Sequence, residues 1–146
     1  MPVIREKLRE GNSVRLFPRG TSMLPMLRQG IDSVLLSPLP EKLSKYDLPL
    51  YQRMNGQYVL HRIVDAGETY TCIGDNQFQF ETGVKHTQMI AVVTAFYRNN
   101  RLISVENVVY RAYCRFWYYS RRWRGLWRQW RGLWRRGKGW LRRHFG

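Results

Sequence analysis

The chain has 146 residues, which is enough for one domain with an appendage, and its formal net charge at pH 7 is +15. Its two cysteines, Cys72 and Cys114, are too few for a disulfide framework and lack the paired Cys/His spacing of a metal site. A glycine-rich phosphate loop is also missing, so the sequence predicts no metal and no cofactor.

The first part of the chain is expected to be mainly β. Residues 2–10 can form a short amphipathic helix. Short strands are expected where polar and apolar residues alternate or where β-favouring residues cluster. These segments are residues 13–17, 33–37, 48–53, 58–65, 69–73, 89–97 and 102–105. Many short strands separated by Gly, Pro and Asn predict a folded β-sheet or a barrel.

Three short motifs in this β-rich part carry chemically useful side chains. Ser22 lies in the turn-like sequence GTSMLPML, His61 in the strand-like sequence YVLHRIV, and Asp75 in the sequence IGDN. A serine hydroxyl needs a base to take its proton, and a neutral histidine suits that task. An aspartate on the second ring nitrogen would orient the imidazole and stabilise its charged form. Together the three residues predict a hydrolytic triad.

Each of these residues also has an ordinary structural interpretation. Ser22 could be a turn or cap residue, His61 a hydrogen-bonded strand histidine, and Asp75 a residue that forms an Asx turn. The order and wording of the three motifs favour the catalytic interpretation over these alternatives.

The three motifs resemble those of the type I signal peptidases, within the group that also contains the LexA-like self-cleaving repressors. That group has its nucleophilic serine in a Ser-Met-x-Pro turn, which residues 22–25 match. The endoplasmic-reticulum type, with archaeal and sporulating-bacterial relatives, has a His-Arg-[Val/Ile] run followed by Gly-Asp-Asn. Residues 61–63 and 74–76 match these two runs. The resemblance covers residues 14–98 and indicates the variant that uses histidine as its base.

The resemblance implies a signal peptidase/LexA-like fold and a serine endopeptidase that cleaves a precursor protein or peptide through an acyl-enzyme. Ser22 would be the nucleophile, His61 the general base, and Asp75 the residue that orients His61. The backbone N–H of Ser22 would bind the oxyanion. Two features depart from the family. Lys45-Tyr46-Asp47 replaces the usual Lys-Gly-Asp, and no transmembrane helix precedes the serine.

A non-catalytic peptide- or membrane-binding module that keeps the same fold is the alternative function. The presence of all three chemical groups favours the enzyme. A self-cleaving repressor is disfavoured because residues 1–13 are too few for a DNA-binding domain.

The composition changes sharply near residue 105. Residues 1–110 contain 13 Lys and Arg and all 10 acidic residues, whereas residues 111–146 contain 12 Lys and Arg and no acidic residue. All six tryptophans lie in this last part. The sequence therefore predicts a catalytic domain of residues 1–105 and a basic, Trp/Arg-rich amphipathic tail of residues 106–146.

The tail contains a seven-residue repeat, because the sequence WRGLWR at residues 123–128 recurs at residues 130–135. In a helix, the apolar side chains of the repeat share one face and the arginines and glycines take the opposite arc. The apolar face consists of Trp123, Leu126, Trp127, Trp130, Leu133 and Trp134, and the opposite arc of Arg121, Arg124, Gly125, Arg128, Arg131, Gly132 and Arg135.

Such a helix predicts peripheral binding to an anionic membrane surface through residues 113–145. No apolar run approaches the roughly 20 residues that cross a bilayer, and the N-terminus lacks the features of a secretory signal. We therefore expect a peripheral protein on the cytoplasmic face of a membrane. Two alternatives remain for the tail. Its Trp/Leu face could pack on the β domain as core, or its arginines could bind nucleic acid, which is disfavoured because the two residue types lie on separate faces.

Overall fold

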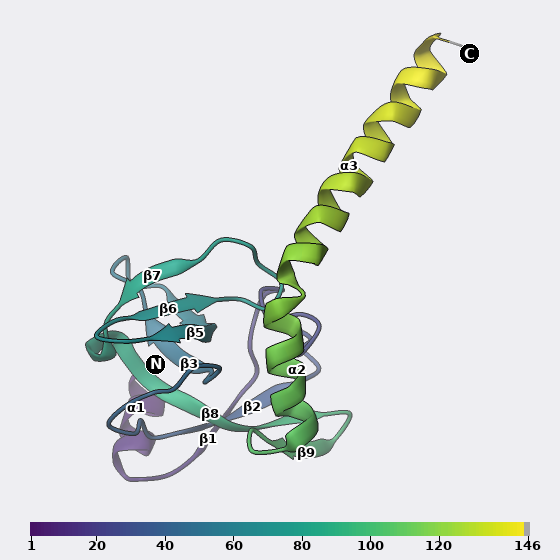
Figure 1. Ribbon diagram of the computed structural model, residues 1–146. Coiled ribbons are helices and arrows are strands. Elements are labelled where there is room, and N and C mark those ends of the chain that lie inside the picture. The colour runs from purple at the N-terminus through teal and green to yellow at the C-terminus, as the bar shows by residue number, and fades with distance from the viewer. Residues whose placement is uncertain (145–146) are drawn as a thin grey trace.

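In the computed structural model, which describes residues 1–144 and the side chains of residues 1–133, nine strands form two antiparallel sheets (Figure 1). The elements in chain order are α1 (Pro2–Arg9), β1 (Val14–Leu16), β2 (Ser33–Ser37), β3 (Pro49–Gln52), β4 (Tyr58–Leu60), β5 (Arg62–Ala66), β6 (Tyr70–Ile73), β7 (Glu81–Val84), the 3₁₀ turn η1 (His86–Gln88), β8 (Met89–Arg98), β9 (Arg101–Ser104), α2 (Val108–Tyr119) and α3 (Arg121–His144). The expected mainly β class is confirmed.

The larger sheet is built around β8. Its strands follow the order β1-β2-β8-β3-β4, and β9 also pairs with β8. β8 is apolar over most of its length and is buried on both faces, as the sequence MIAVVTAF requires. A strand buried on both faces needs such a continuous apolar run, because neither side of it meets water.

The smaller sheet has the order β5-β6-β7 and packs against the larger one. Residues 58–65, which the sequence suggested as one strand, divide at His61 into β4 of the larger sheet and β5 of the smaller sheet. The polar strand β7 was not anticipated. Within the described residues both sheets are open, so the alternative of a closed barrel is wrong.

α2 is part of the core of the domain. The side chain of Asn107 caps its first turn by accepting hydrogen bonds from the backbone N–H groups of Val109 and Tyr110. Tyr110 and Cys114 are buried in the same cluster as residues of β2, β3 and β8. The predicted domain boundary at residue 105 therefore falls before a helix that supplies core residues.

α3 continues from α2 and projects away from the two sheets (Figure 1). Its Trp/Leu face is exposed: Trp123, Trp127 and Trp130 are 76, 69 and 69 % exposed. The opposite face contacts the domain, and the ring of Phe78 lies 3.6 Å from where a Cβ on Gly125 would be. The alternative that the Trp/Leu face packs on the β domain is therefore wrong for the described residues. Trp134 and Arg135 lie outside the described side chains.

No helix in the described part of the chain combines the length and the apolar character that crossing a membrane requires.

Candidate functional site

The turn that carries Ser22 is anchored in the core by the apolar residues that follow the serine. Met23, Met26 and Leu27 are buried, whereas Ser22 itself remains partly exposed. The backbone N–H of Leu27 donates to the carbonyl of Met23, which closes one turn of chain, and the Leu24–Pro25 peptide bond is cis. The apolar residues of the motif thus hold the serine at the surface of a cavity.

The Gly-Asp-Asn motif holds the serine turn from the other side. The backbone N–H of Asn76 donates to the carbonyl oxygen of Ser22 at 2.8 Å, and the Asn76 amide donates to the carbonyl of Thr21 at 3.2 Å. A Cβ on Gly74 would lie 2.6 Å from the Ser22 carbonyl oxygen, so only glycine allows this close approach. The Ser22 turn and the Gly-Asp-Asn motif are therefore joined by backbone hydrogen bonding and close packing.

His61 lies where the chain passes from the larger sheet to the smaller one, and its side chain is 4 % exposed. Its Nδ1 lies 3.4 Å from the hydroxyl of Tyr51 and 3.8 Å from Oε2 of Glu81. Tyr51 donates to Oε2 of Glu81 at 2.6 Å, and Arg53 donates to both oxygens of Glu81. A tyrosine hydroxyl and an ionised carboxylate therefore lie beside Nδ1 of the histidine ring.

The electrostatics of this group favour a neutral imidazole. Burial lowers the pKa of His61 to about 4, with Arg53 adding to the effect and Glu81 opposing it. Burial acts to raise the pKa of Glu81, but hydrogen bonds from Arg53 and Tyr51 outweigh it, so that pKa is lowered. Burial and the hydrogen bond to Glu81 raise the pKa of Tyr51. At neutral pH the group is an uncharged histidine, a protonated tyrosine and a carboxylate.

Ser22 and His61 line the same cavity, which has a volume of about 500 Å³. Residues 18–23 and Leu27 form one side of it, and Arg53, residues 57–61 and the Asn76–Gln77 pair form the rest. Among the described residues, no hydrogen bond joins the Ser22 hydroxyl to His61. The structure thus brings the predicted nucleophile and the predicted base to one solvent-accessible space.

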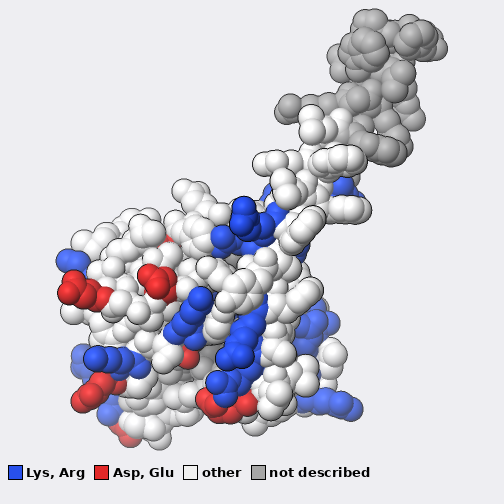
Figure 2. Space-filling model, viewed as in Figure 1, with Lys and Arg blue, Asp and Glu red and all other residues white. Residues whose placement is uncertain are grey.

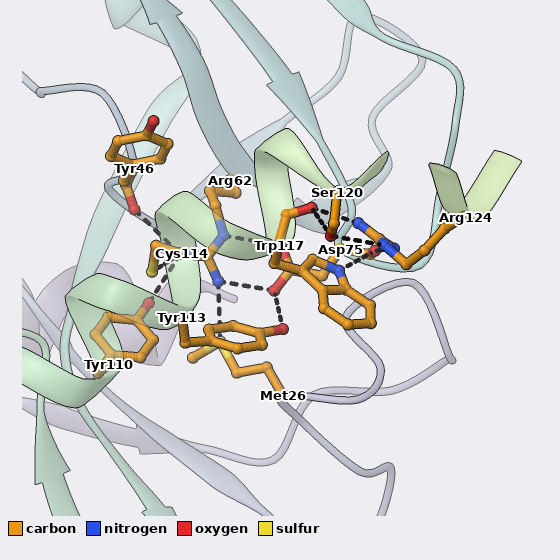
Figure 3. Close-up of polar contacts among 10 residues, drawn as sticks. All are labelled: Met26, Tyr46, Arg62, Asp75, Tyr110, Tyr113, Cys114, Trp117, Ser120 and Arg124. Carbon is orange, nitrogen blue, oxygen red and sulfur yellow. Dashed lines mark hydrogen bonds and ion pairs between the residues drawn. The ribbon is translucent and has the colours of Figure 1, made fainter. Parts of the chain in front are cut away.

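The carboxylate of Asp75 lies in a different group, behind the serine turn (Figure 3). It accepts two hydrogen bonds of 2.8 Å from Arg62 and one of 3.0 Å from the hydroxyl of Tyr113. Arg62 in turn donates to Tyr110 and to the sulfur of Cys114 on α2. The described contacts of the Asp75 side chain are therefore with Arg62 and α2, and they do not include His61.

Sequence reasoning missed Glu81 and Tyr51. Glu81 lies in a polar stretch and reaches His61 only because β7 pairs with β6 and the smaller sheet packs on β3. One signal was available. His61 and Arg62 are consecutive residues of an extended run, and such side chains point to opposite faces. An acid that pairs with Arg62 is therefore poorly placed to reach the His61 ring.

Within the described residues, no group of three or more His, Cys, Asp or Glu side chains is arranged to hold a metal ion.

Comparisons with known proteins identify no relative: no family model matches the chain, and no curated protein or solved structure matches it.

Proposed function

We propose that the protein is a serine endopeptidase, similar to the histidine-type signal peptidases, that cleaves a precursor protein or peptide. The observation that carries the proposal is the buried, neutral His61, which lines one cavity with Ser22 and has Tyr51 and ionised Glu81 behind it. Catalysis by a serine nucleophile needs a base beside the serine hydroxyl and a carboxylate near the other ring nitrogen of that base.

In the proposed reaction, the Ser22 hydroxyl attacks the carbonyl carbon of the scissile bond while Nε2 of His61 takes its proton. Glu81 stabilises the resulting imidazolium, directly and through the hydroxyl of Tyr51 on Nδ1. The backbone N–H of Ser22 binds the oxyanion. His61 then protonates the leaving amine, and water hydrolyses the acyl-enzyme by the same route in reverse.

Asp75 has an indirect role in this proposal. Through its ion pair with Arg62, and through the neighbouring Gly74 and Asn76, it positions the serine turn against the domain. Glu81 takes the part that the sequence suggested for Asp75 as the acid of the histidine.

A serine-directed phosphonylating probe tests the peptidase. The full chain is treated with a rhodamine fluorophosphonate, and the labelled residue is identified by peptide mass spectrometry. We expect label on Ser22 alone, and none in Ser22→Ala or His61→Ala, each of which should keep the wild-type circular dichroism spectrum. Folded wild-type protein that takes up no label, or label on Ser22→Ala, would contradict the proposal. The first of these results would favour a non-catalytic binding module.

We further propose that the exposed apolar face of α3 binds an anionic membrane surface. The domain contacts the Arg/Gly face of the helix, which leaves the tryptophans free to enter the headgroup region. The apolar stripe continues onto α2 through Phe116 and Tyr119, which are exposed at helical spacing from Trp123. Residues 111–146 carry 12 basic residues and no acidic ones, and this charge complements anionic lipid.

Nucleic acid is a weaker candidate partner for the tail. Arg121 and Arg124 are engaged by the domain, since Arg121 lies 4.0 Å from the Phe80 ring centroid and Arg124 donates to the carbonyl of Asp75. Arginines held in this way are less free to stack on bases or to follow a phosphate backbone.

A further inference from the structure

A second cavity also borders His61 and shares Arg53, Asn76 and Gln77 with the first. Its volume is about 710 Å³. Its walls come from His61, from the β3–β4 connection with Arg53 and Asn55, from residues 76–81, which end with Glu81 at the start of β7, and from Arg128 on α3. Because His61 lines both cavities, a peptide at the proposed catalytic site can extend into this second one.

The α3 wall of the second cavity is held against the loop by several contacts. The ring of Phe78 packs on Gly125, at van der Waals distance from where a Cβ would lie. The guanidinium of Arg121 lies over the ring of Phe80, and Arg124 donates to the carbonyl oxygens of Asp75 and Trp117. The first turns of α3 are therefore a fixed part of the domain surface, and Arg128 is placed at the edge of the cavity.

The charges around this cavity are unbalanced. Arg53 is neutralised by its ion pair with Glu81. Arg128 makes no ion pair with any described residue, and its guanidinium carbon lies over the Phe78 ring, 5.6 Å from the ring centroid. Figure 2 shows basic side chains gathered around α2 and the base of α3. The cavity therefore presents an unpaired guanidinium to whatever enters it.

We propose that this cavity is a substrate subsite for an acidic side chain of the peptide, and that Arg128 is the residue that binds it. The inference rests on the proposed peptidase function. A guanidinium presents paired N–H donors that match a carboxylate, and such charge-assisted bonds are stronger than neutral ones. The amides of Asn76, Gln77 and Gln79 also line the cavity and can bond the backbone of an extended peptide.

The rest of the lining fits the same occupant. Phe78 and Phe80 are 38 and 39 % exposed and offer apolar contact beside the polar groups. Since Glu81 is already paired with Arg53 and Tyr51, it adds little repulsion against an incoming carboxylate. In this proposal the tail has two roles. Its apolar face binds the membrane, and its arginine face contributes Arg128 to substrate binding.

Fluorescence anisotropy with two probe peptides tests this subsite. Both are fluorescein-labelled twelve-residue peptides rich in Ala and Ser, and they differ only in carrying three Glu or three Gln. Binding is measured at 150 mM salt to full-length Ser22→Ala, in which no peptide can be cleaved through the serine. We expect the Glu peptide to bind about tenfold more tightly, the effect of one charge-assisted hydrogen bond.

Two further substitutions in the Ser22→Ala chain locate the preference. Arg128→Gln should reduce it to about twofold or less, because only general electrostatic attraction remains. Arg131→Gln removes the same charge from the same helix outside the cavity and should leave the preference unchanged. Equal losses in the two variants, or no preference for the Glu peptide at the outset, overturn the subsite. Because this readout is binding, failure of the peptidase proposal appears separately, as absence of fluorophosphonate label on wild-type Ser22.

Discussion

At the scale of single residues, the sequence suggested one acid, Asp75, as the partner of His61, whereas the structure has two acids near the His61–Arg62 pair. His61 and Arg62 follow each other in the chain, yet each has its own carboxylate, Glu81 for the first and Asp75 for the second. Glu81 is partly exposed beside a cavity, whereas the Arg62–Asp75 pair is almost fully buried. In the proposed reaction Glu81 therefore acts in the chemistry, and Asp75 contributes to the stability of the serine turn.

Two matched amide substitutions separate these roles. Glu81→Gln removes the charge behind the imidazolium and should slow fluorophosphonate labelling of Ser22 by roughly 100-fold or more, with a small loss of stability. Asp75→Asn leaves Arg62 buried without a counter-charge and should lower the free energy of unfolding by about 3–5 kcal/mol. Labelling rates and urea unfolding curves measure the two effects. The reverse pattern would return the orienting role to Asp75.

The pH dependence of labelling tests the environment of His61. A general base must be neutral, and the pKa of His61 is lowered to about 4. The labelling rate should therefore hold from pH 7 down to about pH 5 and reach half of its maximum near pH 4, whereas an unperturbed histidine would give a midpoint near 6.5. Circular dichroism at each pH controls for acid unfolding. A midpoint near 6.5 would mean that the ring is solvated.

At the scale of elements, α2 decides where the domain ends. It buries Tyr110 and Cys114 and supplies the hydroxyl groups of Tyr110 and Tyr113 to the Arg62–Asp75 pair. The ring of Phe96 in β8 lies 5.0 Å from that of Tyr110, centroid to centroid. Thus α2, which the sequence assigned to the basic tail, packs on the core of the domain.

Two truncations test this role of α2. A chain of residues 1–120 keeps the helix and should unfold cooperatively in urea. A chain of residues 1–105 loses it, exposes the ion pair and the apolar surface beneath, and should lack a cooperative transition or aggregate. If residues 1–105 unfold with the same midpoint as residues 1–120, then α2 is an addition to a domain that is complete without it.

At the scale of the whole molecule, the domain sits on the polar side of α3. The Arg/Gly face meets the loop of residues 76–80, and the Trp/Leu face points away from both sheets. A helix lying in a membrane surface with its tryptophans inward would therefore hold the domain, and the cavities beside His61, on the water side.

Vesicle binding tests this orientation. The triple variant Trp123→Ser, Trp127→Ser, Trp130→Ser keeps every charge but loses the apolar surface. In high salt, where the attraction of arginines to anionic lipid is screened, we expect it to bind phosphatidylglycerol vesicles at least about tenfold more weakly than wild type. Gln129→Ser, on the polar side of the same turns, should bind as wild type does. Undiminished binding by the triple variant would exclude insertion of this face.

Local pattern was enough for much of this protein. The alternation in residues 13–17 predicted β1, the short apolar run in residues 33–37 predicted β2, and the period of 3.6 in the tail predicted α3 and its two faces. The motifs around Ser22 and His61 pointed to two side chains that share a cavity. These features depend on residues close together in the chain, so the sequence pattern shows them without knowledge of the contacts between distant residues.

What only the tertiary structure decided depends on contacts between distant residues. The chain passes from the larger sheet to the smaller one at His61 because β4 pairs with β3 and β5 pairs with β6. The sequence around His61 contains no Gly or Pro that would mark the end of a strand. Glu81 reaches His61, and Asp75 reaches Arg62, through pairings 20 and 13 residues apart in numbering. The face of α3 that meets the domain contacts it through Gly125 on Phe78 and Arg121 on Phe80, and hydrophobic periodicity alone does not say which face a domain will contact.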